Sequence, residues 1–318
     1  MEEQWTRRNF CLALGALGAS ATLGAAEPGK DSMPFKLGVI TDEITQDLDK
    51  ALDFIASYSL SYCELRELWG SNIMTLSPSD LERAKQIIEK HHVQVAEIAS
   101  PLFKYNLPEM PAQPSERRDT FMATFTDQDT ESLLKKSFQI ARFFGTEKIR
   151  IFSYWRVEDP EKAYPHMRER LAKAAAVAAQ NKMTLLLENE PACNVGTGKE
   201  LGRLVRDINS PALRAMWDPA NAVVLDEIPY PDGYKHVRGL FPHLHVKDAK
   251  RDTSTGKTRW LPVGSGDVDF RGQFQALLQD GYRGTISLET HYRRPDGNSL
   301  ESSRESLEGL LKVLKSVA

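Results

Sequence analysis

The chain has 318 residues, of which 41% are hydrophobic and 27% are charged. This composition is typical of a globular protein with one large core or two modest ones, and it argues against disorder. Its 41 Lys and Arg residues stand against 44 Asp and Glu residues, which gives a formal net charge of -3. Because nucleic-acid binding depends on excess positive charge that neutralises phosphates, we expect no nucleic-acid partner.

The first residues carry a pattern that resembles a twin-arginine export signal. Arg7 and Arg8 precede an uncharged run from Cys11 to Ala26, which is shorter than the about 20 apolar residues that span a bilayer. We therefore expect a signal peptide at 1–26 and no stable membrane anchor. A chance pair of arginines is the alternative. The mature protein would be periplasmic or secreted, with the twin-arginine translocase as a partner during export. That pathway carries folded proteins.

Two cysteines, Cys63 and Cys193, would remain after cleavage. Two residues do not make a disulfide framework, although the predicted location would tolerate a bridge. Buried cysteines usually behave as small hydrophobic residues, and this is the interpretation that we adopt for both.

After a short linker at 27–35, strand and helix patterns alternate along the chain. The predicted helices include 79–91, 129–144, 160–181 and 300–317. The predicted strands are Lys36–Ile40, Tyr62–Arg66, Val93–Ala99, Lys148–Phe152, Thr184–Glu188, Leu213–Trp217, His243–Val246 and Thr285–Glu289.

Eight strand-and-helix units over about 280 residues predict a single (β/α)8 TIM barrel at 36–318. Alternation with helices implies a parallel sheet buried on both faces, which explains the continuously apolar run from Thr184 to Leu187. The main alternative is an open doubly wound sheet. Against it, no strand is followed by a glycine-rich dinucleotide-binding turn. The longest irregular stretch, from Pro101 to Phe125, follows the third strand, where a barrel carries active-site loops.

The last four predicted strands end in metal-ligand residues: Glu188, Asp218, His245 and Glu289. Strand ends of a barrel meet at one mouth, so these side chains should converge on one divalent ion. Oxygen-rich ligation with one nitrogen favours Mn2+, with Mg2+, Co2+ and Zn2+ as alternatives. Each residue alone could instead be a helix cap or a packing residue. Capping does not require a ligand at four successive strand ends, however.

Five segments of the chain resemble the xylose isomerase-like barrels grouped as sugar phosphate isomerases and epimerases. They are LLLEN (185–189), WDP (217–219), HLHVKD (243–248), VGSGDV (263–268) and ISLET (286–290). The resemblance implies that the four strand-end residues bind the metal. It also implies that Glu188 and Glu289 act as acid and base on either side of a sugar.

The resemblance suggests further residues that would contact the substrate. Arg251, six residues after His245, matches an arginine that holds substrate oxygens in ketose epimerases. Asn221 stands where those enzymes have a histidine, so the substrate or the metal count would differ from theirs. We also expect contacts from Lys247 and from Trp155, which runs straight out of a strand end.

The first hypothesis for function is a metal-dependent isomerase or epimerase that acts on an unphosphorylated sugar or polyol through an enediolate. The second is a lyase that cleaves 3-oxo-glycosides by β-elimination at the same site. The third is a periplasmic sugar- or metal-binding protein without catalysis. All four ligand positions are filled, which argues against it, because binding alone would not require both Glu188 and Glu289. In each case the partner is a small-molecule sugar or glycoside, and a homo-oligomer is compatible with the sequence.

Overall fold

A computed structural model describes residues 35–115 and 118–317. The expected signal peptide and nearly all of the expected linker lie outside the described residues, so the export prediction is not tested here.

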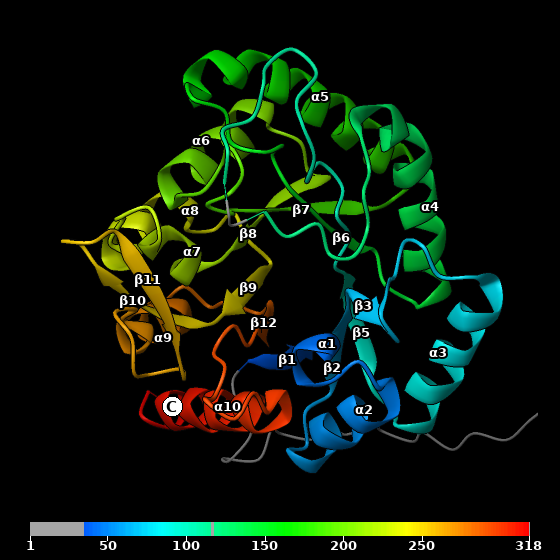
Figure 1. Ribbon diagram of the computed structural model, residues 1–318, viewed down its shortest axis with the longest axis vertical. Coiled ribbons are helices and arrows are strands. Elements are labelled where there is room, and N and C mark those ends of the chain that lie inside the picture. Colours follow the sequence, from blue (N-terminus) through cyan, green and yellow to red (C-terminus); the bar gives the residue numbers. More distant parts are fainter. Residues whose placement is uncertain (1–34, 116–117, 318) are drawn as a thin grey trace, which may run out of the picture. The chain divides into compact units, whose positions relative to one another are not determined.

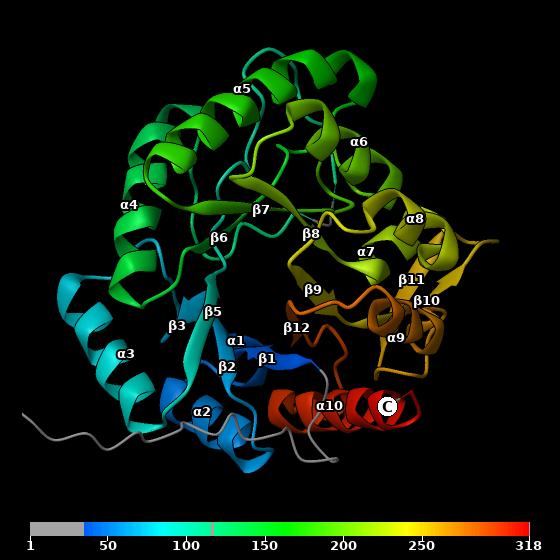
Figure 2. The same cartoon turned by 180° about the vertical axis from the view of Figure 1, so that it is seen from behind.

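Eight parallel strands close into a barrel, and helices surround it in both views (Figure 1 and Figure 2). The order around the barrel is β1-β12-β9-β8-β7-β6-β5-β2, so β12 closes on β1. The barrel strands are β1 (Lys36–Ile40), β2 (Tyr62–Leu65), β5 (Gln94–Ile98), β6 (Lys148–Ile151), β7 (Thr184–Glu188), β8 (Leu213–Trp217), β9 (His243–Val246) and β12 (Thr285–Leu288). This arrangement confirms the predicted (β/α)8 fold, and the predicted strands differ from the observed ones only at their ends.

Longer helices cover the outside of the barrel, and shorter ones lie in the loops. The longer helices are α2 (Leu48–Ser57), α3 (Pro78–Lys90), α4 (Thr130–Phe143), α5 (Pro160–Gln180), α6 (Gly198–Ile208), α9 (Phe270–Gln279) and α10 (Ser299–Lys315). The short ones are α1 (Thr41–Ile44), α7 (Pro219–Val223) and α8 (Tyr234–Val237), with single turns at Asp127–Asp129 and Pro229–Gly233. Within the part of the chain that the structure describes, none of the helices has the length and apolar character needed to cross a bilayer.

Capping chemistry sets several helix ends. The side chain of Ser77 accepts the backbone N–H of Asp80, and Pro78 opens α3, one residue before the predicted start. Proline suits this position because the first N–H groups of a helix have no partner within the helix. Thr197 and Glu200 form a capping box at the start of α6.

Two hairpins that the sequence did not predict follow barrel strands at the mouth. One is β3 (Glu67–Leu68) with β4 (Ser71–Asn72), and the other is β10 (Asp248–Asp252) with β11 (Lys257–Leu261). The predicted irregular stretch from Pro101 to Phe125 has no named helix or strand among its described residues. Both hairpins and this irregular stretch therefore follow the carboxyl ends of barrel strands.

One substitution in the hydrophobic core is expected to lower the stability of the protein strongly. The side chain of Phe274 on α9 is fully buried, and its ring lies 6.1 Å from that of Phe35 and 5.6 Å from that of Phe270. We expect Phe274→Ala to lower the free energy of unfolding by about 3–5 kcal/mol, because it removes a packed ring and leaves a cavity. Urea denaturation would measure this. The exposed neighbour Gln275→Ala should change stability by about 0.5 kcal/mol or less. Equal losses in both variants would contradict the packing seen here.

Candidate active site

The structure brings together the four residues predicted as metal ligands. Glu188 ends β7, Asp218 directly follows β8, His245 lies in β9, and Glu289 directly follows β12. All four side chains are buried, and each offers one ligand atom within 4.8 Å of the others. Atoms bound at about 2.0–2.2 Å to one ion lie up to about 4.4 Å apart, so the cluster has the right size for a single divalent ion.

Individual atoms of the cluster also fit an ion. Glu188 Oε2 and Asp218 Oδ2 are buried, and their contacts are ion pairs, with Arg150 Nη1 at 3.3 Å and with Lys247 Nζ at 2.7 Å. Such oxygens are costly to bury unless a cation compensates them. On His245 the Nδ1 atom faces the cluster, 3.2 Å from Glu188 Oε1 and 3.6 Å from Glu289 Oε2. Three carboxylates and one imidazole would therefore hold the ion.

Hydrogen bonds with Asn189 and Asn221 orient Asp218. Its backbone N–H donates to Asn189 Oδ1 at 2.9 Å, and its carbonyl accepts from Asn189 Nδ2 at 2.8 Å. Asp218 Oδ1 accepts the backbone N–H of Asn221 as the N-cap of α7, which leaves Oδ2 to face the cluster. The amide of Asn221 donates to the carbonyl of Asn189 at 2.8 Å. The structure therefore places Asn221 in the scaffold behind Asp218, and a contact with substrate stays a prediction.

A buried carboxylate, Glu64 on β2, holds His245 from behind. Glu64 Oε2 lies 3.0 Å from His245 Nε2, and Oε1 lies 2.7 Å from Nε2 of His243. With Nε2 bonded to Glu64, the Nδ1 atom of His245 is the one that can bind an ion. Carboxylates in this position fix the tautomer and the ring orientation of metal-binding histidines.

We expect Glu64→Gln to weaken metal binding about 10- to 100-fold. An amide has one acceptor oxygen, so it cannot accept from both histidines as the carboxylate does. Competition with a fluorescent chelator would measure the affinity for Mn2+. Glu82→Gln, an exposed substitution on α3, is the matched control and should leave the affinity unchanged. An unchanged affinity in folded Glu64→Gln would rule out this supporting role.

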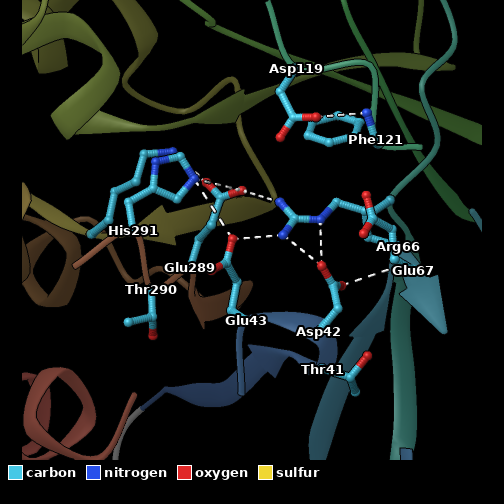
Figure 3. A network of polar contacts seen from close by, with 12 residues as sticks. Thr41, Asp42, Glu43, Arg66, Glu67, Asp119, Phe121, Glu289, Thr290 and His291 are labelled. Carbon is cyan, nitrogen blue, oxygen red and sulfur yellow. Dashed lines mark hydrogen bonds and ion pairs between the residues drawn. The ribbon is translucent and has the colours of Figure 1, made fainter. Parts of the chain in front are cut away.

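The other oxygen of Glu289 is held by Arg66, as Figure 3 shows. Arg66 Nη1 donates to Glu289 Oε1 at 3.1 Å, and Nη2 donates to Asp42 Oδ2 and to Glu43 Oε1, both at 2.6 Å. His291 Nε2 lies 3.7 Å from Glu289 Oε1. Because a buried arginine and a partly exposed histidine fix one oxygen, Glu289 Oε2 is left facing the cluster.

Two further cations contact the cluster. Lys247 Nζ lies 2.7 Å from Asp218 Oδ2 and also pairs with Glu289 Oε2. Arg150 Nη1 lies 3.3 Å from Glu188 Oε2 and 3.8 Å from Glu289 Oε1. Burial alone would raise the pKa of both glutamates. The charges of Arg150 and His245 nevertheless hold the pKa of Glu188 below its usual value, and those of Lys247 and His291 hold the pKa of Glu289 well below. Both glutamates are therefore ionised at neutral pH.

Metal affinity should depend steeply on pH. Burial raises the pKa of Asp218 to about 6, although Lys247 partly offsets this effect. Burial opposes a charge on His245, but Glu64 and Glu188 outweigh it and raise the pKa of His245 well above its usual value. Both groups must lose protons before they bind a metal. We expect the Mn2+ affinity to fall about tenfold per unit as the pH is lowered from 8 to 6, and about 100-fold per unit below pH 6.

Calorimetric titration of Mn2+ at several pH values in buffers of different ionisation enthalpy would also count the protons released. The control is Asp218→Asn, in which the steeper segment below pH 6 should disappear. An affinity independent of pH between 5 and 8 would contradict this assignment of ligands.

The structure does not bring the other two predicted substrate contacts to the cluster. Arg251 lies on β10, where its Nε donates to Asp226 Oδ1 at 2.9 Å. Trp155 is 5% exposed and packs in a separate cluster with Phe121 and Phe152. Arg251 belongs to the β10–β11 hairpin, which follows β9. Its spacing from His245 in the sequence therefore does not predict where its side chain lies. Contact with substrate stays a prediction for both residues, and for Arg251 it would require the pair with Asp226 to open.

Comparison with known proteins places this barrel in a family. A family model for the xylose isomerase-like TIM barrel matches residues 52–313. The chain is 25% identical over 283 residues to an inosose dehydratase from Clostridium perfringens, covering 84% of this chain and 93% of the relative. It is 27% identical over 164 residues to an L-ribulose-5-phosphate 3-epimerase from Shigella boydii, covering 49% of this chain and 54% of that one.

A solved structure shares the fold. It is a xylose isomerase-like TIM barrel protein from Mycobacterium smegmatis in complex with magnesium, with a TM-score of 0.62, 20% identity, and coverage of 85% of this chain and 89% of that one. The chain therefore belongs to the xylose isomerase-like TIM barrel family. The curated relatives named above are enzymes that act on small sugar-like molecules, by dehydration in one case and by epimerisation in the other.

Proposed function

We propose that this protein is a divalent-metal-dependent isomerase or epimerase that removes a proton next to the carbonyl of a keto sugar or keto polyol. One observation carries the proposal: two ionised glutamates, Glu188 and Glu289, meet at one candidate metal cluster from different strands. Binding of a metal or a sugar alone would not require both glutamates at one ion. Mn2+ is the ion that we propose, with Mg2+, Co2+ and Zn2+ as alternatives.

The residues have distinct roles in this reaction. A bound divalent ion would polarise the carbonyl and stabilise the negative charge that develops on the substrate oxygen. One glutamate removes the proton, and the other returns a proton to the neighbouring carbon or to the opposite face. Lys247 and Arg150 hold both glutamates ionised, so that one of them is ready to act as a base at neutral pH. Arg66 keeps the Glu289 carboxylate oriented toward the substrate.

The second candidate is a lyase that eliminates a group from the β-carbon of a keto sugar or cyclitol. It is favoured by the similarity to inosose dehydratase, which covers 84% of this chain. The first step is the same proton abstraction. The leaving group then departs with its electron pair and must gain a proton, and the ammonium of Lys247, beside Asp218 and Glu289, is the donor that we propose.

We also propose that the protein acts outside the cytoplasm. This proposal rests on Arg7, Arg8 and the uncharged run that follows them. Detection of the mature protein in the periplasm, and its loss when both arginines are replaced by lysine, would test the location.

The reaction is tested in D2O with protein loaded with Mn2+, followed by NMR. Candidate substrates are ketoses, 3-oxo-glucosides and inososes. Deuterium that enters an intact sugar supports isomerisation or epimerisation, whereas release of an aglycone or of water with a new double bond supports the lyase. If neither reaction occurs and Glu289→Gln binds metal and sugars as the wild type does, the enzyme proposal is wrong.

A further inference from the structure

Two buried cations lie side by side next to the metal cluster. Lys104, in the loop after β5, and Arg150, on β6, are both buried. Lys104 Nζ lies 3.6 Å from the ring centroid of Phe121 and 4.5 Å from that of Phe152. The Arg150 guanidinium carbon lies 5.0 Å from each of the same two centroids. Both positive groups therefore face the same small region of the mouth.

Their charges are only partly compensated. Nε and Nη1 of Arg150 are buried, and neither donates a well-aligned hydrogen bond to a residue in 35–115 or 118–317, although Nη1 forms ion pairs with Glu188 Oε2 at 3.3 Å and Glu289 Oε1 at 3.8 Å. Nη2 reaches the carbonyl of Ala99 at 3.4 Å. Lys104 Nζ reaches Glu190 Oε2, also at 3.4 Å, which is long for a charge-assisted bond. Buried donors without acceptors are costly, and two like charges against the same rings add repulsion. An anionic group between them would relieve both costs.

Aromatic residues border this region. The ring of Phe121 covers the cations from the side of the irregular loop, and its centroid lies 5.9 Å from that of Phe152. Phe121 and Met122 both have positive φ, at 52° and 54°. Left-handed backbone at two successive non-glycine residues costs about 1–3 kcal/mol each. The loop thus holds the Phe121 ring beside both cations with a strained backbone.

We infer that Lys104 and Arg150 form a subsite for a carboxylate on the substrate, so that the enzyme acts on an acidic keto sugar or cyclitol. This inference rests on the proposed function and names the substrate class for the same site. Arg150 contacts Glu188 of the metal cluster, so the carboxylate would sit beside the reacting carbon. The ammonium of Lys104 and the guanidinium of Arg150 can together bind one carboxylate.

Binding of three matched sugars to the full chain loaded with Mn2+ tests the inference. D-fructose, D-fructuronate and D-fructose 6-phosphate share a ketose but differ in the group at carbon 6. By calorimetry we expect D-fructuronate to bind about 10- to 100-fold more tightly than D-fructose, because hydrogen bonds to charged groups are the stronger ones. Lys104→Met should reduce the affinity for D-fructuronate to that for D-fructose without changing D-fructose binding or metal content. Lys104→Arg should restore most of it. Lys162→Met, an exposed substitution on α5, is the control.

Each other outcome overturns the inference. Equal affinity of the wild type for D-fructose and D-fructuronate would exclude a carboxylate subsite and leave the proposed function intact. A preference that persists in Lys104→Met would mean that the metal ion binds the carboxylate. Tighter binding of the 6-phosphate than of the uronate would assign the subsite to phosphate. Failure of the proposed function itself is seen separately, as absence of metal binding or of deuterium exchange with any substrate.

Discussion

Glu289→Gln is expected to lower turnover by at least about 1,000-fold while the protein stays folded. Glu289 is predicted to bind the metal and to transfer a proton, and general acid–base catalysis alone contributes about 10²–10⁴-fold. The amide cannot accept a proton from carbon, and it binds a hard cation more weakly than a carboxylate does. The measurement is deuterium exchange into the substrate, followed by NMR at a Mn2+ concentration that saturates the variant.

Two controls separate the chemical role from metal loss. Metal content is measured on the same sample, so that lost catalysis is not confused with an empty site. Glu308→Gln, an exposed carboxylate on α10, should keep wild-type turnover and stability. If Glu289→Gln binds Mn2+ fully and exchanges deuterium within about tenfold of the wild-type rate, Glu289 is not the base.

The residues of the candidate metal cluster could be predicted because one simple rule governs them. In a parallel barrel the strand ends share one mouth, and a carboxylate or imidazole at each of four successive ends is visible without a structure. The apolar runs that define the strands, and the alternation of strand and helix periodicity, are patterns formed by residues that are close together in the sequence. For this reason the fold and the convergence of Glu188, Asp218, His245 and Glu289 were both predicted.

The residues that support the cluster were missed because they do not lie at strand ends. Glu64, Glu97 and Arg150 are inner positions of β2, β5 and β6, and all three are fully buried. Burial, with the charge of Glu64 as a second cause, raises the pKa of Glu97 well above its usual value. A signal was present: three strands of a sheet buried on both faces each carry a charged residue. Such a residue needs a buried partner, but the sequence does not say which one.

Long-range side-chain contacts set a second limit on prediction. Arg66 contacts Asp42 and Glu43, which lie 24 and 23 positions before it, and Glu289, which lies 223 positions after it. The spacing of residues along the chain gives no hint of the contact with Glu289. Arg251 shows the opposite problem. Its spacing from His245 suggested a contact, but the β10–β11 hairpin places it against Asp226. Spacing predicts position only where the intervening chain is a strand or a helix.

Removal of the metal should abolish activity and lower thermal stability without unfolding the protein. Three carboxylates meet in the cluster, but Lys247 and Arg150 compensate part of their charge, so the metal-free barrel should remain folded. An ion at 100 times its dissociation constant adds about 2.7 kcal/mol to the stability of the native state. For a domain of this size, that corresponds to a rise in Tm of roughly 4–5 °C. Dialysis against a chelator, followed by calorimetry and addition of Mn2+, measures both effects.

The matched variant for this experiment is Asp218→Asn. The substitution removes the charge of one ligand. The hydrogen bonds with Asn189 and Asn221 can still hold the side chain at position 218 in place. Its Tm should therefore respond to Mn2+ by less than half of the wild-type shift. A chelator-treated wild type that keeps its turnover would show that the cluster needs no ion. In that case Lys247, whose ammonium already contacts Asp218 and Glu289, would be the group that supplies positive charge to the reaction.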